Sequence, residues 1–321
     1  MRKLYLGAAL CAMTVPAIAQ ADCGEVSITE MNWASASVVT NVASFIMTQG
    51  YGCDVSIIPS DTVPAVTSVA ENGEPDIVTE LWLNSTGDAF QRLEDEGKIV
   101  RLGKVLEPGG VEGWWLPTYL VEAHPELATI EGVLNNPELV GGMFNNCPDG
   151  WGCRVVNDNL IPEIGLEEAG IEVFNHGSGE TLSSSMASAV ENGQPWFGYY
   201  WGPTVPLGKY NMTRVSLGEY NAEIHENNQN PDTESAGVSD FPAAPILTAV
   251  TTDFQEREPA VAEMLSHLSF DVDTMSSVLA WKDANSASGQ EAAVYYLTNN
   301  TEVWSEWLND EAREKLAAVI N

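Results

Sequence analysis

The chain contains ten tryptophans, and several lie where short apolar runs end. Trp33 and Trp82 come at the ends of predicted strands, Trp151 lies between two cysteines, and Trp201 follows another strand. A quaternary ammonium has no N–H donor, so hydrogen bonds to its head are unavailable. Aromatic faces attract such a cation, by about 0.5–1 kcal/mol when exposed and about 2 kcal/mol or more when desolvated. Several rings around one methylated head could therefore support micromolar binding, which needs about −8 kcal/mol.

The other tryptophans divide between this cleft and ordinary packing. The pair Trp114-Trp115 directly follows Glu112-Gly113, and we expect Trp115 to face the cleft. A tryptophan more often packs than binds, and this interpretation suits Trp196, Trp281, Trp304 and Trp307.

Two acidic residues, Glu80 and Glu112, lie near the aromatic segments. Most carboxylates are solvated or make structural hydrogen bonds. Beside a bound ligand they would instead favour a cationic or protonated compound over one with an exposed carboxylate. Both interpretations remain open from the residues alone.

The elements that must position these side chains follow from periodicity. Short apolar runs alternate with amphipathic stretches, which predicts right-handed βαβ units and mostly parallel sheets. The predicted strands are 26–29, 55–58, 76–79, 142–144, 171–174, 196–200 and 246–252. The predicted helices are 37–49, one opening near 61, 85–96, 180–191, 256–268, 273–283, 289–299 and 310–320. Ligands of open α/β sheets bind beyond the carboxyl ends of the strands, where the tryptophans lie.

Two series of alternating strands and helices, followed by one more strand at 246–252, predict two lobes. Each lobe has a mostly parallel sheet flanked by helices. We assign residues 22–120 plus 246–321 to lobe 1 and residues 121–245 to lobe 2, with a hinge between them. The stretch 220–245 is rich in Asn, Asp, Glu and Pro and reads as a loop.

Residues 1–21 have the pattern of a secretory signal peptide. Arg2 and Lys3 precede an apolar run, and small residues allow cleavage after Ala19 or Ala21. We therefore expect a periplasmic, monomeric protein, since no later stretch is long and apolar enough to span a bilayer. The formal net charge of −33 argues against binding nucleic acid or anionic lipid surfaces.

Four cysteines remain after the signal peptide, and in an exported protein an even number favours disulfides over metal ligation. Four cysteines allow three connectivities. Cys147 and Cys153 flank a turn-forming segment and could close a small loop, while Cys23 and Cys53 each precede a predicted strand and could join neighbouring strands. We expect no metal and no cofactor.

Three segments together resemble the glycine betaine-type substrate-binding proteins of ABC importers. They are residues 146–153 (NCPDGWGC), 199–201 (YYW) and 80–82 (ELW), and the similarity extends over most of the chain after the signal peptide. The resemblance implies the type II-like periplasmic-binding-protein fold, in which two α/β lobes close over the ligand. It also implies an inner-membrane ABC permease, with its ATPase, as partner.

In that family one ring from each of three segments boxes the trimethylammonium head, and these positions fall on Trp82, Trp151 and Trp201. The resemblance also places a ligand carboxylate on the backbone amides of Gly152 and Cys153. Such amides at a tight turn or helix start suit an anion. Some relatives carry a carboxylate-binding histidine where this chain has Thr86, so Thr86 or Ser85 would donate instead.

Other functions have weaker support. Ser183-Ser184-Ser185 could contain a nucleophile, but no G-x-S-x-G elbow or histidine partner accompanies it, so we expect no enzyme activity. The same cleft could present ligand to a chemoreceptor or sensor kinase. Asp232, Glu234 and Asp240 could form a Ca²⁺ site, although EF-hand spacing is absent. The methylated ligands that remain open are glycine betaine, choline, carnitine, proline betaine, dimethylsulfoniopropionate and trimethylamine N-oxide.

Overall fold

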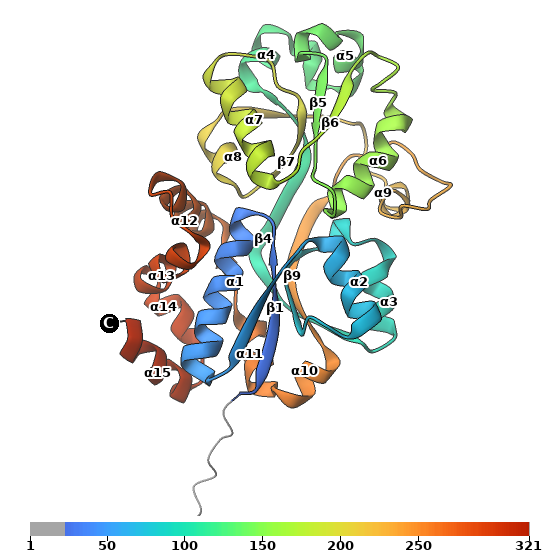
Figure 1. Cartoon of the computed structure of the whole chain (residues 1–321). Coiled ribbons are helices and arrows are strands. Elements are labelled where there is room, and N and C mark those ends of the chain that lie inside the picture. The colour runs from blue at the N-terminus through green and yellow to red at the C-terminus, as the bar shows by residue number, and fades with distance from the viewer. Residues whose placement is uncertain (1–22, 321) are drawn as a thin grey trace, which may run out of the picture.

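The computed structural model describes residues 23–320, so the predicted signal peptide lies outside the described residues. Two α/β lobes are stacked end to end, and two long strands run from one lobe into the other (Figure 1). The structure therefore has the predicted mixed α/β, two-lobed architecture.

Lobe 1 contains the first βαβ units. β1 (Glu25–Met31) pairs in parallel with β2 (Asp54–Ser60) and β3 (Ile77–Trp82). The helices that follow these strands are α1 (Ala34–Ile46), α2 (Thr62–Asn72) and α3 (Gly87–Asp95). The predicted order of elements is confirmed. β3 extends three residues beyond the predicted end, through Trp82, and so places this ring at the carboxyl end of the strand.

Lobe 2 repeats the parallel pattern. β5 (Met143–Asn146) pairs in parallel with β6 (Glu172–Asn175) and with β7 (Gly198–Gly202). Its helices are α4 (Thr118–Ala123), α5 (Ile130–Asn135), α6 (Gly152–Ile164), α7 (Gly179–Glu191) and α8 (Val205–Lys209). The predicted helix 180–191 is confirmed as α7.

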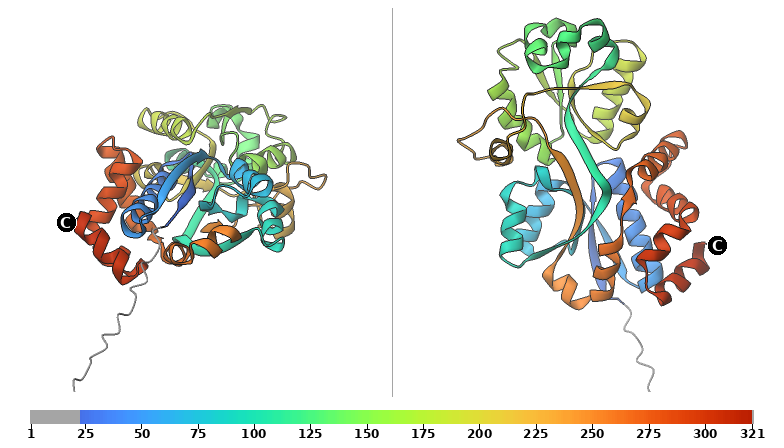
Figure 2. Two further views of the ribbon diagram at one scale, coloured as in Figure 1. Left: turned by 60° about the horizontal axis from the view of Figure 1, so that its bottom comes forward. Right: turned by 180° about the vertical axis from the view of Figure 1, so that it is seen from behind.

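The strands that connect the lobes are β4 (Ile99–Pro117) and β9 (Ala243–Thr251), which run antiparallel to each other. Both views of Figure 2 and Figure 1 show them side by side along the molecule. β4 also pairs with β7, β8 (Met212–Val215) and β10 (Phe270–Asp271), giving the order β2-β1-β3-β9-β4-β7-β5-β6. The predicted lobe borders at residues 120 and 245 fall near the lobe-2 ends of these two strands.

The C-terminal helices return to lobe 1 (Figure 1). They are α10 (Thr252–Arg257), α11 (Pro259–His267), α12 (Val272–Ala284), α13 (Gly289–Asn299), α14 (Thr301–Trp304) and α15 (Asp310–Ile320). Of these, α12 and α13 pack against α1. The single helix predicted at 256–268 is wrong, because Pro259 opens a separate helix and disfavours helical backbone at Glu258. Trp304 and Trp307 are buried among these helices, and Trp281 stacks on Tyr295.

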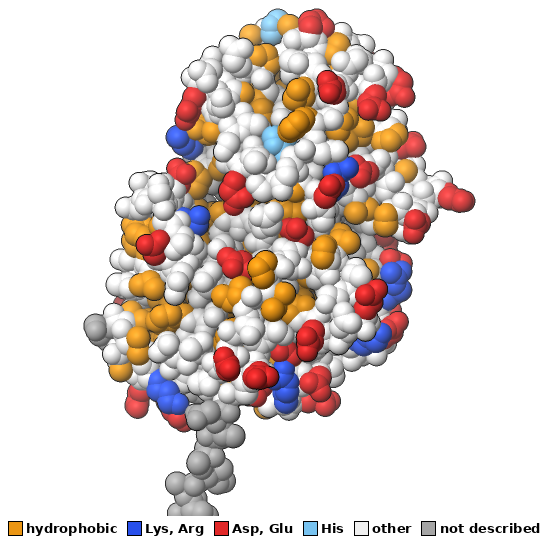
Figure 3. Space-filling view, in the orientation of Figure 1, with side chains coloured by type: hydrophobic (Ala, Val, Ile, Leu, Met, Phe, Trp, Pro, Cys, Tyr) orange, Lys and Arg blue, Asp and Glu red, His pale blue; other side chains and the backbone are white. Residues whose placement is uncertain are grey.

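The polar stretch 220–245 is not entirely a loop, since it contains α9 (Ala222–Asn228). Asn221 caps this helix by accepting a hydrogen bond from the Ile224 N–H. The polar composition of the stretch favoured a loop, so the helix was not predicted. Asp240 of the same stretch pairs with Arg214 at 2.6 Å. Figure 3 shows acidic side chains scattered over the viewed face rather than gathered in one patch.

Every helix between residues 23 and 320 is too short or too polar to cross a membrane.

Candidate functional site

A cavity lies between the two lobes, and we call it the interlobe cavity. About 290 Å³ of space, part of it open to solvent, lies between the lining atoms. The lining residues are Trp33, Thr62, Trp82, Ser85, Glu112, Trp151, Gly152, Cys153, Tyr199 and Trp201. Four of the predicted rings therefore meet in one place, and no basic side chain is among the described residues that line it.

The rings form a connected aromatic wall. The Trp151 ring lies edge-on to Trp33 at 5.2 Å and to Trp201 at 4.9 Å between centroids. Tyr199 lies nearly parallel to Trp201 at 6.3 Å. Rings from both lobes thus offer their faces and edges to one small volume, an arrangement that favours a compact methylated cation.

Lobe 1 supplies two of the rings from the ends of parallel strands. Trp33 follows β1 and occupies the N-cap position of α1, while Trp82 is the last residue of β3. The Trp82 ring packs over the backbone of Gly110 in β4, where an added Cβ would lie 2.3 Å from it. A glycine at this position allows the ring to reach the cavity.

Lobe 2 supplies Trp151 from the loop closed by the disulfide between Cys147 and Cys153. Trp151 is the N-cap residue of α6, and Gly152 and Cys153 are the first helical residues. N–H groups at this position have no acceptor within the helix, so they are suited to an anionic oxygen. The Trp151 indole donates a hydrogen bond to Asp61 of lobe 1 at 3.0 Å, which fixes the ring across the cleft.

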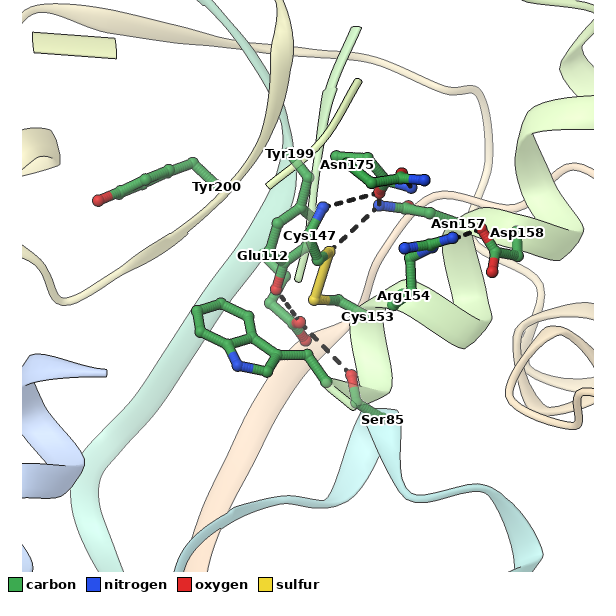
Figure 4. Close-up of a disulfide and its surroundings, with 12 residues drawn as sticks. Ser85, Glu112, Cys147, Cys153, Arg154, Asn157, Asp158, Asn175, Tyr199 and Tyr200 are labelled. Atoms are coloured by element: carbon green, nitrogen blue, oxygen red, sulfur yellow. Dashed lines mark hydrogen bonds and ion pairs between the residues drawn. A yellow bond between two sulfur atoms is a disulfide. The ribbon is translucent and has the colours of Figure 1, made fainter. Parts of the chain in front are cut away.

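Glu112 is the charged residue of the cavity wall. It lies on β4 opposite Trp201 and is almost fully buried. Figure 4 shows Ser85 and Tyr199 reaching it from different elements, and both donate hydrogen bonds to its carboxyl group, as does Asn84. Burial raises the pKa of Glu112 to about 7, although the hydrogen bonds and the charge of Arg214 oppose the shift.

Glu80 lies behind the rings rather than in the cavity wall. Its Oε1 accepts hydrogen bonds from the Trp33 indole and the Ser35 hydroxyl, both at 2.6 Å. Burial raises its pKa to about 7, while hydrogen bonds from Ser35, Trp33 and Trp82 favour the charged form.

Two other predicted site residues do not line the interlobe cavity. Trp115 lies on the face of β4 opposite to Glu112, because side chains alternate along a strand. Its indole donates to the Tyr200 carbonyl at 3.0 Å, and its neighbour Trp114 is buried against Phe144. Neither ring of the pair therefore faces this space.

Thr86 likewise points elsewhere. Its hydroxyl donates to the Leu83 carbonyl at 3.0 Å, and Ser85 takes the place at the cavity.

Tyr199 and Thr62 line the cavity without having been predicted as contacts, and Ser85, the predicted alternative to Thr86, lines it too. Tyr199 could have been found from the sequence, because it precedes Trp201 by two residues on one strand and so shares its face. The second disulfide, Cys23–Cys53, joins the beginnings of β1 and β2, which is one of the connectivities that the sequence left open. The Ser185 hydroxyl donates to Leu182 and accepts from Trp196, which is a structural role.

Comparisons with known proteins identify the family. A family model for the substrate-binding domain of the ABC-type glycine betaine transport system matches residues 24–299. A trimethylamine N-oxide-binding protein of Pelagibacter ubique is 23% identical over 288 residues, which cover 85% of this chain and 87% of that protein.

Solved structures show the same fold. A choline-binding protein of an ABC transporter, in complex with choline, has a TM-score of 0.74 at 17% identity, with 93% of this chain and 99% of that one covered. Lactococcal OpuAC, closed on glycine betaine, has a TM-score of 0.71 at 19% identity, with coverages of 89% and 100%.

The family matched here consists of transport proteins rather than enzymes, and its members are periplasmic or extracytoplasmic. They bind small quaternary ammonium ligands and work with ABC transporter permeases. The chain belongs to the family of substrate-binding domains of ABC-type glycine betaine transport systems.

Proposed function

We propose that this protein is exported, captures a small methylated ammonium compound in the interlobe cavity, and delivers it to an ABC permease. The observation that carries the proposal is the wall of rings from both lobes around a cavity whose charged side chain is acidic. Four tryptophan rings line the cavity, and around one methylated head they supply about 2 kcal/mol each, or about 8 kcal/mol together, where water is excluded. No counter-charge in direct contact is then required for micromolar affinity.

The polar groups of the cavity favour particular members of this ligand class. Glu112 suits a compound that is cationic, or that offers a hydroxyl proton, and it opposes an exposed carboxylate nearby. The N–H groups of Gly152 and Cys153 suit an oxygen that carries negative charge or accepts hydrogen bonds. Choline and trimethylamine N-oxide each combine a methylated head with a single small oxygen group. Two similar proteins carry names that say they bind these compounds. We therefore rank them above glycine betaine.

Calorimetric titration of the mature protein with the six methylated compounds tests this proposal. We expect saturable binding of at least one compound, with choline or trimethylamine N-oxide tighter than glycine betaine. The absence of binding across the whole panel would contradict the proposed ligand class.

Replacing Trp151 with Ala should lower the affinity for the tightest-binding ligand by about 10-fold or more, since one desolvated ring contributes about 2 kcal/mol. Trp281→Ala is the matched control, because Trp281 stacks on Tyr295 among the C-terminal helices. Equal affinities in the two variants would show that Trp151 does not contact the ligand. Circular dichroism would check that both variants remain folded.

A further inference from the structure

Glu80 has two unusual properties that the proposed contacts with ligand do not explain. It is fully buried, and its backbone φ is +51°, which a residue other than glycine seldom adopts. The pairing of β3 with β9 shifts register between Val78 and Leu81, so Glu80 lies in a local irregularity of the strand. Such irregularities re-aim side chains and occur often beside functional sites.

The carboxyl group of Glu80 is directed at the rings of lobe 1. Oε1 accepts from the Trp33 indole and the Ser35 hydroxyl, both at 2.6 Å. Oε2 is buried and makes no hydrogen bond of good geometry within residues 23–320, although the nearby Trp82 indole also favours the charged form of the carboxyl group. Within that part of the chain this carboxyl group takes part in no ion pair, so its negative charge has no neutralising neighbour.

An uncompensated buried charge is costly, and a bound group of opposite charge reduces that cost. Here a bound cation would supply the missing opposite charge, because Trp33 both lines the interlobe cavity and donates a hydrogen bond to Glu80. A carboxylate that accepts the indole N–H also makes the face of that indole more negative. Both effects strengthen the attraction of the ring for a cation and leave its contact with a neutral methyl group unchanged.

We propose that Glu80 is a positioning residue that fixes Trp33 and makes the lobe-1 side of the cavity select methyl groups that carry positive charge. This inference rests on the proposed function and deepens it. Glu112 acts at the cavity wall, whereas Glu80 acts through a ring and does not contact the ligand. The recognised chemistry is a permanently charged methylated head rather than a merely apolar one of the same shape.

The test compares choline with its uncharged analogue, in which a carbon atom replaces the ammonium nitrogen. Glu80→Gln keeps an oxygen that accepts from Trp33 and Ser35 but removes the charge. We expect Glu80→Gln to bind choline about 5- to 30-fold more weakly, the equivalent of about 1–2 kcal/mol, with little change for the analogue. Glu131→Gln on the exposed side of α5 removes one charge far from the cavity, and should alter neither affinity.

The outcomes separate the two proposals. A wild-type protein that does not prefer choline to the analogue contradicts the proposed function. A preference of undiminished size in Glu80→Gln, or an equal loss for both ligands, overturns the inference and leaves Glu80 with a purely structural role.

A measurement on the wild-type protein covers the case in which Glu80→Gln does not fold. The Trp33 indole N–H resonance, assigned with Trp33→Phe, should lie downfield of exposed indoles and resist solvent exchange in the choline complex. A resonance in the range of exposed indoles would show that the bond to Glu80 does not exist with ligand bound, and would overturn the inference.

Discussion

At the scale of single residues, two buried carboxyl groups determine how this cavity responds to charge. Glu112 lines the cavity and Glu80 lies behind Trp33, and burial raises the pKa of each to about 7. Near neutral pH each group is therefore divided between its neutral and charged forms. A bound cation favours the charged form, so it lowers both pKa values in the complex and releases protons on binding.

The affinity for choline should consequently rise between about pH 6 and pH 8 and level off above that range. Below the pKa of the free protein, the loss is at most about tenfold per pH unit for each carboxyl group. Choline is the suitable probe because its own charge does not change with pH. Calorimetry in buffers of different ionisation enthalpy would report the released protons directly.

The Glu80→Gln, Glu112→Gln double variant provides the control for this prediction, because it has neither titrating group. Its choline affinity should be low and independent of pH over the same range. A wild-type affinity that is flat from pH 6 to pH 8 would show that neither group changes its protonation with ligand.

At the scale of elements, the two disulfides serve different parts of the fold. Cys147–Cys153 closes a short loop, with a sequence separation of 6, that holds Trp151 and the first turn of α6 at the cavity. Cys23–Cys53 has a separation of 30 and joins β1 to β2 away from the cavity. Loop-closure entropy assigns about 2 kcal/mol of stability to the first and about 4 kcal/mol to the second.

Replacing each pair with serines should therefore separate binding from stability. Removal of Cys147–Cys153 should weaken ligand binding markedly with a small change in melting temperature, because the loop loses its fixed shape. Removal of Cys23–Cys53 should lower the melting temperature more and leave affinity nearly unchanged. Calorimetric titration and thermal unfolding of both variants check this, and the reverse pattern would contradict it.

At the scale of the whole molecule, the lobes approach each other closely at Gly152. A Cβ added there would lie 1.9 Å from the Ser85 carbonyl oxygen of lobe 1. The same side of the cleft is joined by a backbone hydrogen bond from Val63 to Gly150 at 3.1 Å. Close by, the Gly87 N–H donates to Gln229 at 2.8 Å. The described arrangement is thus one in which the lobes are in contact around the cavity.

Gly152→Ala should keep both lobes folded but prevent this approach, because the added methyl group meets backbone rather than a movable side chain. We expect ligand affinity to fall at least about 10-fold, since contacts from one lobe are lost. Small-angle scattering should show no ligand-induced compaction in this variant. Gly177→Ala is the control, because a Cβ at Gly177 meets nothing within 4 Å. Normal compaction and affinity in Gly152→Ala would contradict this account of closure.

The sequence by itself determined the local features of this protein. Alternating apolar runs located most strands and helices, and the carboxyl ends of those strands located Trp33, Trp82, Trp151 and Trp201. Periodicity records which residues form an element and which face is apolar, so features carried by a single element could be predicted.

Only the tertiary structure decided how distant elements combine. The longest strand, β4, was not predicted because Gly103 and the run Pro108-Gly109-Gly110 interrupt its pattern, and its antiparallel pairing with β9 joins residues far apart in sequence. The phase of that strand places Glu112 in the cavity and Trp115 on the opposite face, because adjacent side chains alternate. The backbone irregularity at Glu80 likewise directs its carboxyl group behind Trp33. Strand phase and register depend on the partner strand, and no local pattern of residue types contains that information.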